Sequence, residues 1–186
     1  MIEHEAAFTS AGLRLSATLT LPGDHAPGPC VLLMGGSGQV DRDENHKRFP
    51  INVMSDMAHH LAARGVASLR YDKRGVGRSE GDYWQTGFHD NIADATAAMA
   101  VLSSRDEVEE DKIFLLGHSE GAYIATSMAA TAAAVGATPS PGGVGSPAGV
   151  VLLAGGARSA EEELVWQARQ VAGGLTGLNA YLIKLL

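Results

Sequence analysis

Hydrophobic and polar residues alternate along residues 5–21, which is the period of a half-buried β-strand. In the second part of this segment, apolar residues occupy one side: Leu13, Leu15, Ala17, Leu19 and Leu21. Ser10, Ala11 and Gly12 interrupt the alternation and form a predicted turn. The pattern therefore predicts an antiparallel hairpin near the start of the chain.

Beyond this hairpin, short apolar runs alternate with segments of helical spacing. Buried strands are predicted at residues 30–34, 66–71, 112–116 and 149–153. Helices are predicted at residues 52–64, 91–103 and 120–134. Strands separated by helices pair in parallel through right-handed crossovers. The fold class predicted is α/β, with a doubly wound, mostly parallel sheet and an N-terminal antiparallel hairpin.

Two segments do not belong to this minimal sheet. Residues 136–148 are low in complexity and have no hydrophobic period, so a surface loop is predicted there. Ser159 and Glu162 form a capping box, which predicts a helix running to about residue 172. The tail at residues 175–186 is apolar and slightly amphipathic, so we expect it to need a surface to pack on.

Composition narrows the class of protein. The chain has 186 residues, 45% of them hydrophobic, which is enough for one core of ordinary size. A net charge of -7 argues against a nucleic-acid partner, and no apolar stretch approaches the about 20 residues of a membrane span. Cys30 is the single cysteine, and residues 1–7 do not resemble a secretory signal. We therefore expect a cytoplasmic protein, and the sequence indicates no metal and no cofactor.

The strongest chemical signal is the sequence Gly-His-Ser-Glu-Gly at residues 117–121, between a predicted strand and a predicted helix. A GxSxG sequence in this context predicts a nucleophile elbow, in which a sharp turn exposes the serine hydroxyl. Gly117 and Gly121 remove Cβ atoms that would collide with the neighbouring strand and helix, and His118 completes the turn. The alternative is a small-residue connection as in a dinucleotide-binding fold, but no GxGxxG follows the first parallel strand. We interpret Ser119 as a catalytic nucleophile.

Acyl transfer also needs backbone N–H donors that stabilise the tetrahedral oxyanion. One predicted donor is the N–H of Glu120, the residue after the nucleophile. The second is the N–H of Ser37, in the turn that follows the strand at residues 30–34, where Gly36 allows close approach of the substrate carbonyl. The alternative for this segment is a plain glycine-rich turn.

Three segments together resemble the bacterial α/β-hydrolase serine esterases that have a GSGxxDRD loop, a group related to acyl-CoA thioester hydrolases and dipeptidyl-peptidase-like hydrolases. They are GGSGQVDRDE (35–44), YDKRGVGRSEG (71–81) and LLGHSEGAYIA (115–125). The resemblance covers about residues 5–160. It implies that Asp72 and Arg74 brace neighbouring loops. Asp41, Arg42 and Asp43 are expected either to fix the oxyanion loop through charge-assisted hydrogen bonds or to form a solvated charge run.

In the α/β-hydrolase fold an acid and a histidine follow the nucleophile along the chain. After Ser119 the sequence has no Asp and no His, and its carboxylates are those of residues 161–163 in the predicted helix start. The histidines upstream of the nucleophile are expected to be noncatalytic: His46, His59, His60, His89 and His118. We therefore expect a C-terminally truncated, incomplete α/β-hydrolase, with a core at residues 1–156 and the start of a helical lid at residues 157–186.

Two classes of function remain open. The first is a serine hydrolase that cleaves small-molecule carboxylic esters or thioesters through an acyl-enzyme on Ser119, with a serine peptidase or acyl transferase as variants of the same chemistry. The second is a noncatalytic fragment or small-molecule-binding or interaction protein, because serine without an imidazole base is a weak nucleophile. The apolar residues of the C-terminal segment predict self-association.

Overall fold

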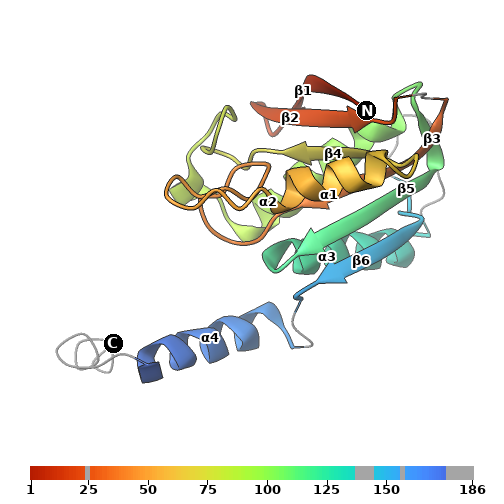
Figure 1. Ribbon diagram of the computed structural model, residues 1–186. Coiled ribbons are helices and arrows are strands. Elements are labelled where there is room, and N and C mark those ends of the chain that lie inside the picture. Colours follow the sequence, from red (N-terminus) through yellow and green to blue (C-terminus); the bar gives the residue numbers. More distant parts are fainter. Residues whose placement is uncertain (24–25, 137–144, 156–157, 175–186) are drawn as a thin grey trace. The chain divides into compact units, whose positions relative to one another are not determined.

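The computed structural model describes residues 1–23, 26–136, 145–155 and 158–174 (Figure 1). The chain divides into two compact units, Met1–Gly155 and Gly156–Leu186. The first unit contains the sheet and the residues predicted to carry the chemistry. The second unit contains helix α4 (Ala160–Gly174).

The sheet of the first unit has the strand order β1-β2-β4-β3-β5-β6 among the described residues. The β1–β2 and β2–β4 pairs are antiparallel, and the β3–β4, β3–β5 and β5–β6 pairs are parallel. This arrangement confirms the predicted α/β sheet with its antiparallel start. The strands are β1 (Ile2–Ser10), β2 (Leu13–Leu21), β3 (Gly28–Met34), β4 (Ala67–Tyr71), β5 (Val108–His118) and β6 (Gly149–Leu153).

The hairpin turn lies at the predicted position. Ala11 and Gly12 have φ values of 48° and 80°, the left-handed pair that a two-residue turn between antiparallel strands requires. The turn sets the register, so that Phe8 pairs with Leu15 and Ala6 with Ala17. The apolar side of β2 is consequently buried as the alternation predicts.

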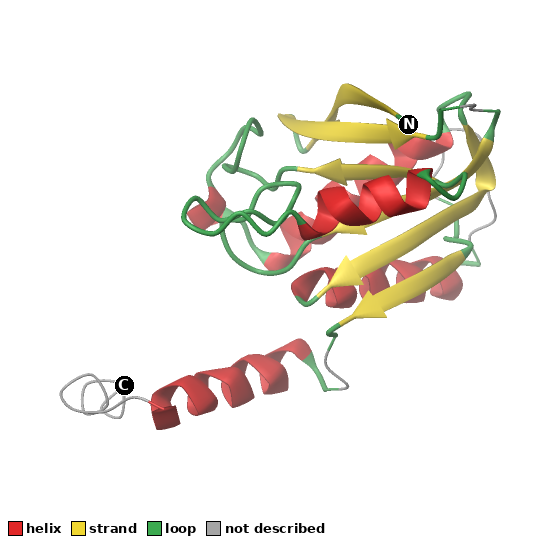
Figure 2. Ribbon diagram, viewed as in Figure 1, coloured by secondary structure: helices red, strands yellow, loops and turns green. Residues whose placement is uncertain are grey.

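The helices cover both faces of the sheet (Figure 2). Helix α1 (Val53–Ala62) packs against the face that carries Val31 and Leu33 of β3. Helices α2 (Phe88–Ser103) and α3 (Glu120–Ala134) pack against the opposite face. Because side chains of a strand alternate between faces, the single strand β3 contributes to both layers of the core. The sheet is therefore doubly wound, as predicted.

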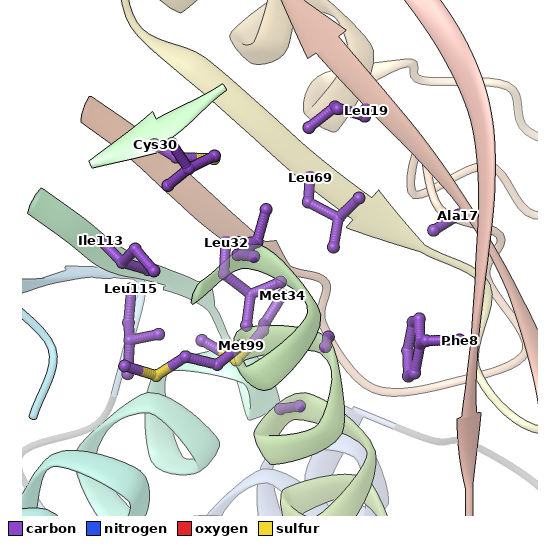
Figure 3. Packing of buried hydrophobic residues seen from close by; sticks show 14 of the residues in the cluster. Phe8, Ala17, Leu19, Cys30, Leu32, Met34, Leu69, Met99, Ile113 and Leu115 are labelled. Carbon is purple, nitrogen blue, oxygen red and sulfur yellow. The ribbon is translucent and has the colours of Figure 1, made fainter. Parts of the chain in front are cut away.

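The larger core cluster lies between the sheet and helices α2 and α3 (Figure 3). Leu32 of β3 and Leu115 of β5 are fully buried there, beside Met99 of α2. This packing fixes the ends of β3 and β5 relative to each other. The turns that follow these two strands carry the candidate site.

The largest differences in bounds from the prediction concern three elements. Strand β5 begins at Val108 instead of residue 112, because Val108 pairs with Gly28 through the backbone although charged residues follow it. Helix α2 begins at Phe88 instead of residue 91, and the Asp90 carboxylate accepts the N–H of Gly87 at 2.8 Å. A short 3₁₀ helix, η1 (Tyr83–Gln85), was not predicted. Backbone pairing and capping extend these elements beyond the hydrophobic pattern.

Strand β6 lies where it was predicted, but it is not a buried strand. Val150, Val151 and Leu152 are 37%, 44% and 52% exposed. Within the described residues β6 pairs only with β5 and is the last strand of the sheet. Hydrophobic composition alone predicts burial, whereas burial depends on the neighbours that cover the strand.

The remaining predictions concern the loops and the second unit. Residues 137–144 of the predicted surface loop and the apolar tail at 175–186 lie outside the described residues. The capping box is confirmed, because the Glu162 carboxylate accepts the Ser159 N–H at 3.1 Å and the Ser159 hydroxyl accepts the Glu162 N–H at 3.2 Å. In the described part of the chain, none of the helices has the length and apolar character needed to cross a membrane.

Candidate active site

Ser119 stands at the corner between β5 and α3. Its backbone has φ 52° and ψ -114°, a conformation that residues with a side chain rarely adopt. Such a conformation costs on the order of 1–3 kcal/mol and persists only where the surrounding structure enforces it. The Ser119 N–H donates to the carbonyl oxygen of Leu153 at 2.9 Å. The side chain is half-buried, and no hydrogen bond of its hydroxyl is found among the described residues.

Two glycines make this corner sterically accessible. A Cβ atom on Gly117 would lie 2.0 Å from the carbonyl oxygen of Gly121. A Cβ atom on Gly121 would lie 2.2 Å from the carbonyl oxygen of Met34, at the end of β3. Real Cβ contacts are never this short, so neither position tolerates a side chain without backbone movement. Cβ atoms at these two positions would therefore collide with neighbouring backbone, as expected from the sequence.

The turn after β3 lies against Ser119. A Cβ atom on Gly36 would lie 3.3 Å from the Ser119 Cβ and 3.3 Å from His118 Nδ1. The Gly36 N–H donates to Oε1 of Glu44, so it is not free to bind a substrate oxygen. Ser37 is exposed, and its N–H has no hydrogen-bond partner in the part of the chain that the structure describes. The structure thus brings Gly36 and Ser119 together, and Ser37 follows Gly36 in the same turn.

Glu44 is a residue of the site that the sequence reasoning missed. It is only 3% exposed, its φ is 63°, and its Oε1 contacts His118 Nδ1 at 2.7 Å. The His118 side chain, next in sequence to Ser119, is therefore engaged with a carboxylate. The one sequence signal that could have identified Glu44 is its place at the end of the GGSGQVDRDE segment.

Lys73 is the second missed residue. Its ammonium donates to the carbonyl oxygen of Gly36 and forms an ion pair with Glu120 Oε2 at 2.9 Å. The Lys73 side chain is 10% exposed and that of Glu120 is 25% exposed. Lys73 follows β4, so it reaches from a third element of the sheet to both turns of the site. No periodicity in the sequence indicates this contact.

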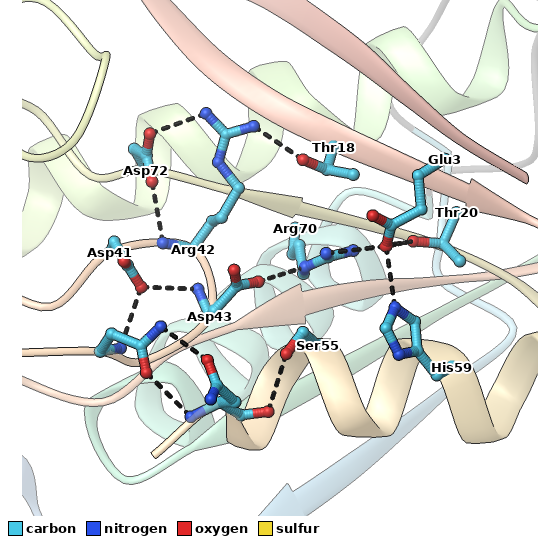
Figure 4. A network of polar contacts seen from close by, with 12 residues as sticks. Glu3, Thr18, Thr20, Asp41, Arg42, Asp43, Ser55, His59, Arg70 and Asp72 are labelled. Carbon is cyan, nitrogen blue, oxygen red and sulfur yellow. Dashed lines mark hydrogen bonds and ion pairs between the residues drawn. The ribbon is translucent and has the colours of Figure 1, made fainter. Parts of the chain in front are cut away.

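A network of charged residues holds the loop at residues 35–44, which follows β3 (Figure 4). Asp72 accepts the Arg42 N–H at 2.8 Å and the Arg42 guanidinium at 2.7 Å. The Asp43 carboxylate binds the Arg70 guanidinium, which also contacts Glu3 at 2.9 Å. Asp41 accepts the N–H groups of Asp43 and Asn45, each at 2.9 Å. These contacts fix the loop after β3 and are not those of a solvated charge run, whereas its oxyanion role stays a prediction.

The protonation of Asp72 reflects this network. Burial favours the neutral acid, but hydrogen bonds from the Arg42 side chain and from the N–H groups of Arg78 and Arg42 favour the carboxylate more strongly. They hold the pKa of Asp72 below its ordinary value.

Arg74 braces helix α2 through ion pairs with Asp94 at 2.7 Å and with Asp90 at 2.9 Å. The structural roles expected for Asp72 and Arg74 agree with these contacts.

Other described histidines are hydrogen-bonded to groups other than Ser119. His59 Nε2 contacts Glu3 Oε1 at 3.0 Å, and His60 Nδ1 contacts the carbonyl oxygen of Asp56 at 2.8 Å. His46 lines a cavity of about 520 Å³ between the loops at 39–50 and 75–77. Among the described residues, no cluster of three or more His, Cys, Asp or Glu side chains is arranged to hold a metal ion.

Comparison with known proteins identifies the family. The model of the serine aminopeptidase S33 family matches residues 50–171, a range that includes β4, β5, Ser119 and α3. The chain belongs to the serine aminopeptidase S33 family. The S33 chain is thus a member of a hydrolase family, as its resemblance to serine esterases implied.

Individual relatives agree with this family. Esterase EstD of Thermotoga maritima is 32% identical over 148 residues, which are 80% of this S33 chain and 32% of EstD. The α/β hydrolase GrgF from Penicillium sp. sh18 has a TM-score of 0.64 at 20% identity, covering 91% of this chain and 54% of GrgF. The thioesterase domain from the curacin biosynthetic pathway has a TM-score of 0.59 at 18% identity. The match covers 95% of this chain and 56% of that domain's chain.

These comparisons confirm the predicted α/β-hydrolase fold. The S33 chain spans about a third of EstD and about half of each of the two solved structures. It therefore corresponds to part of the fold that these relatives contain. The solved structures, which are less than 25% identical, support the fold and not a particular substrate.

We predict that Gly117→Ala destabilises the protein by about 2 kcal/mol or more, because the new methyl group overlaps the Gly121 carbonyl. The matched control is Gly28→Ala, whose Cβ would lie 3.6 Å from the nearest carbonyl oxygen. We expect the control to change stability by less than about 1 kcal/mol. Urea unfolding of the two variants measures the difference, and equal costs would contradict the steric account.

A second prediction concerns pH. Asp72→Asn removes the charged partner of buried Arg42 and should cost about 3 kcal/mol at pH 7. Because the folded pKa of Asp72 is lowered, its stabilising contribution is present above the ordinary Asp pKa of about 3.9 and is lost as pH falls through the folded value. The stability difference between the native chain and the variant should therefore shrink below about pH 4. A constant difference from pH 7 to pH 2 in chemical unfolding would contradict this assignment.

Proposed function

We propose that the protein hydrolyses small-molecule carboxylic esters or thioesters through an acyl-enzyme on Ser119. The observation that carries the proposal is the position of Ser119, strained at φ 52° and half-buried, next to the turn of Gly36 and Ser37. The Ser37 N–H in this turn has no hydrogen-bond partner among the described residues. The relatives support this class of substrate, since one is named an esterase and another a thioesterase domain. The fold by itself would support many other reactions.

In the proposed reaction, the Ser119 oxygen attacks the carbonyl carbon while its proton passes to a base. The N–H groups of Ser37 and Glu120 stabilise the tetrahedral oxyanion, and each such donor contributes about 2.7–4 kcal/mol to lowering the barrier. The intermediate expels the alcohol or thiol, which takes up the proton. Water then attacks the acyl-enzyme by the same route, releases the carboxylic acid and restores the serine.

The base is the part of this reaction that the described residues do not supply. His118 is bound to Glu44, and none of the described histidines is hydrogen-bonded to Ser119. In this fold the acid and histidine come from later strands. We propose that the complete catalytic apparatus combines the nucleophile and oxyanion donors of this chain with an acid and a histidine that lie outside its sequence.

Two alternatives follow from specific observations. The family is named for a serine aminopeptidase, so hydrolysis of an amide by the same Ser119 is the first. Acyl transfer is a variant in which another acceptor replaces water. The absence of a histidine at Ser119 among the described residues favours the second alternative, a noncatalytic small-molecule-binding or interaction protein. A comparison of ester, thioester and aminoacyl-amide substrates separates the first alternative from the proposal.

The proposal also covers the surroundings of the enzyme. We propose a cytoplasmic protein whose partner is a small molecule and not a nucleic acid, consistent with the net charge of -7. In the second unit, Val165 and Trp166 of α4 are each 45% exposed. These apolar side chains support the proposed self-association, and their role as part of a lid remains a prediction.

We predict that a fluorophosphonate probe labels the chain at Ser119 and that Ser119→Ala abolishes labelling. Because no described histidine contacts Ser119, free imidazole should increase the labelling rate by supplying a base. Mass spectrometry of the labelled peptide identifies the modified residue. A folded chain that remains unlabelled, with and without imidazole, would favour the noncatalytic alternative.

The oxyanion donor is tested by a pair of substitutions at one position. Ser37→Pro removes the backbone N–H, whereas Ser37→Ala keeps it and removes only the hydroxyl. We expect Ser37→Pro to be labelled on the order of 100-fold more slowly than Ser37→Ala, which is the usual effect of losing one oxyanion donor. Equal labelling rates in two folded variants would exclude Ser37 as the donor.

A further inference from the structure

Lys73 is placed to control the orientation of a peptide group in the oxyanion loop. It is 8% exposed, and its ammonium donates to the carbonyl oxygen of Gly36. That carbonyl belongs to the peptide group whose N–H is the N–H of Ser37. A trans peptide is planar, with its C=O and N–H pointing in opposite directions. An ammonium on the oxygen side therefore directs the Ser37 N–H away from Lys73.

Gly36 needs such a constraint because glycine has no Cβ to limit its backbone angles. A Cβ atom here would lie 3.2–3.3 Å from atoms of Glu44, His118 and Ser119, which is tighter than ordinary van der Waals contact and favours glycine, the residue whose peptide groups rotate most easily. Glu44 holds the peptide group before Gly36 by accepting its N–H. Lys73 holds the peptide group after it by donating to its carbonyl. The two residues together fix both peptide planes.

The same ammonium also reaches the other half of the site. Lys73 Nζ lies 2.9 Å from Glu120 Oε2, and Glu120 begins helix α3 directly after Ser119. The second predicted oxyanion donor is the N–H of this Glu120. One buried cation therefore joins the turn after β3 to the turn after β5.

We propose that Lys73 is a positioning residue that holds the Gly36–Ser37 peptide with its N–H toward the substrate and keeps it in register with the Glu120 N–H. This inference rests on the proposed function, because it concerns the oxyanion donors of that reaction. Lys73 touches no reacting atom and acts through the Gly36 carbonyl. Without the ammonium, the Gly36–Ser37 peptide is free to rotate and the donor is lost.

The first test compares Lys73→Met with the native chain in reaction with a fluorophosphonate. Methionine keeps much of the apolar stem and removes the ammonium. We expect the maximal rate of Ser119 labelling to fall at least tenfold, while the probe concentration giving half-maximal rate changes less than threefold. A loss of stability alone would not lower the maximal labelling rate while leaving the half-maximal probe concentration nearly unchanged. An unchanged maximal rate in folded Lys73→Met would overturn the proposal.

Chemical rescue supplies a matched control that keeps the same backbone. In Lys73→Cys, alkylation of the introduced thiol with bromoethylamine rebuilds a side chain of nearly lysine length with a terminal ammonium. The native Cys30 is fully buried, and burial raises its pKa to about 12, so it is a poor competitor for alkylation. We expect alkylation to restore at least half of the lost labelling rate. Failure of a folded, alkylated chain to recover would overturn the proposal.

A measurement on the unsubstituted chain separates this inference from the proposed function. Lys73 Nζ donates a hydrogen bond to the Gly36 carbonyl oxygen. Low-temperature NMR should detect a scalar coupling, transmitted through this bond, between the Nζ nitrogen and the Gly36 carbonyl carbon. Its absence would overturn the role of Lys73 even if Ser119 is labelled, and even if the variants do not fold. Its presence in a chain whose Ser119 is never labelled would refute the hydrolase proposal while leaving the contact established.

Discussion

The candidate site depends on a steric constraint at the ends of two neighbouring strands. Position 121 lies so close to the carbonyl of Met34, and position 117 so close to the carbonyl of Gly121, that neither has room for a Cβ atom. This close approach lets α3 begin directly after β5 and places Ser119 in a left-handed backbone conformation. The buried contacts of β3 and β5 with α2 and α3 hold the strained residue in place.

Paired charges behind the loop after β3 complement this constraint. Arg42 binds Asp72, Arg70 binds Asp43 and Glu3, and Lys73 binds Glu120. Burying such charges is unfavourable unless each is paired, and breaking a pair costs more than forming it gains. These pairs join the hairpin, the loop after β3 and the loop after β4, so they restrict the relative movement of the turns that surround Ser119.

The distribution of the site over the chain has a consequence for catalysis. Ser119, which we propose as the nucleophile, the glycines around it and both proposed oxyanion donors lie between residues 36 and 121, within the first compact unit. The curated relative is about three times longer than the part matched by this chain. In the proposed reaction, stabilisation of the oxyanion and activation of the serine are thus assigned to different residues. The proposed oxyanion donors lie in the turns at the strand ends, whereas the described residues provide no base hydrogen-bonded to Ser119.

The sequence by itself determined the hairpin, the alternation of strands and helices and the corner at Ser119, because hydrophobic period, capping boxes and glycine spacing are local signals. It overestimated the burial of β6, whose cover depends on neighbouring elements. Only the tertiary structure revealed Glu44 and Lys73 as parts of the site. Lys73 contacts Gly36 and Glu120, which are both distant in sequence. Glu44 contacts the distant His118 as well as the nearby Gly36. Such contacts arise where parallel strands end together, and no pattern within a single segment encodes them.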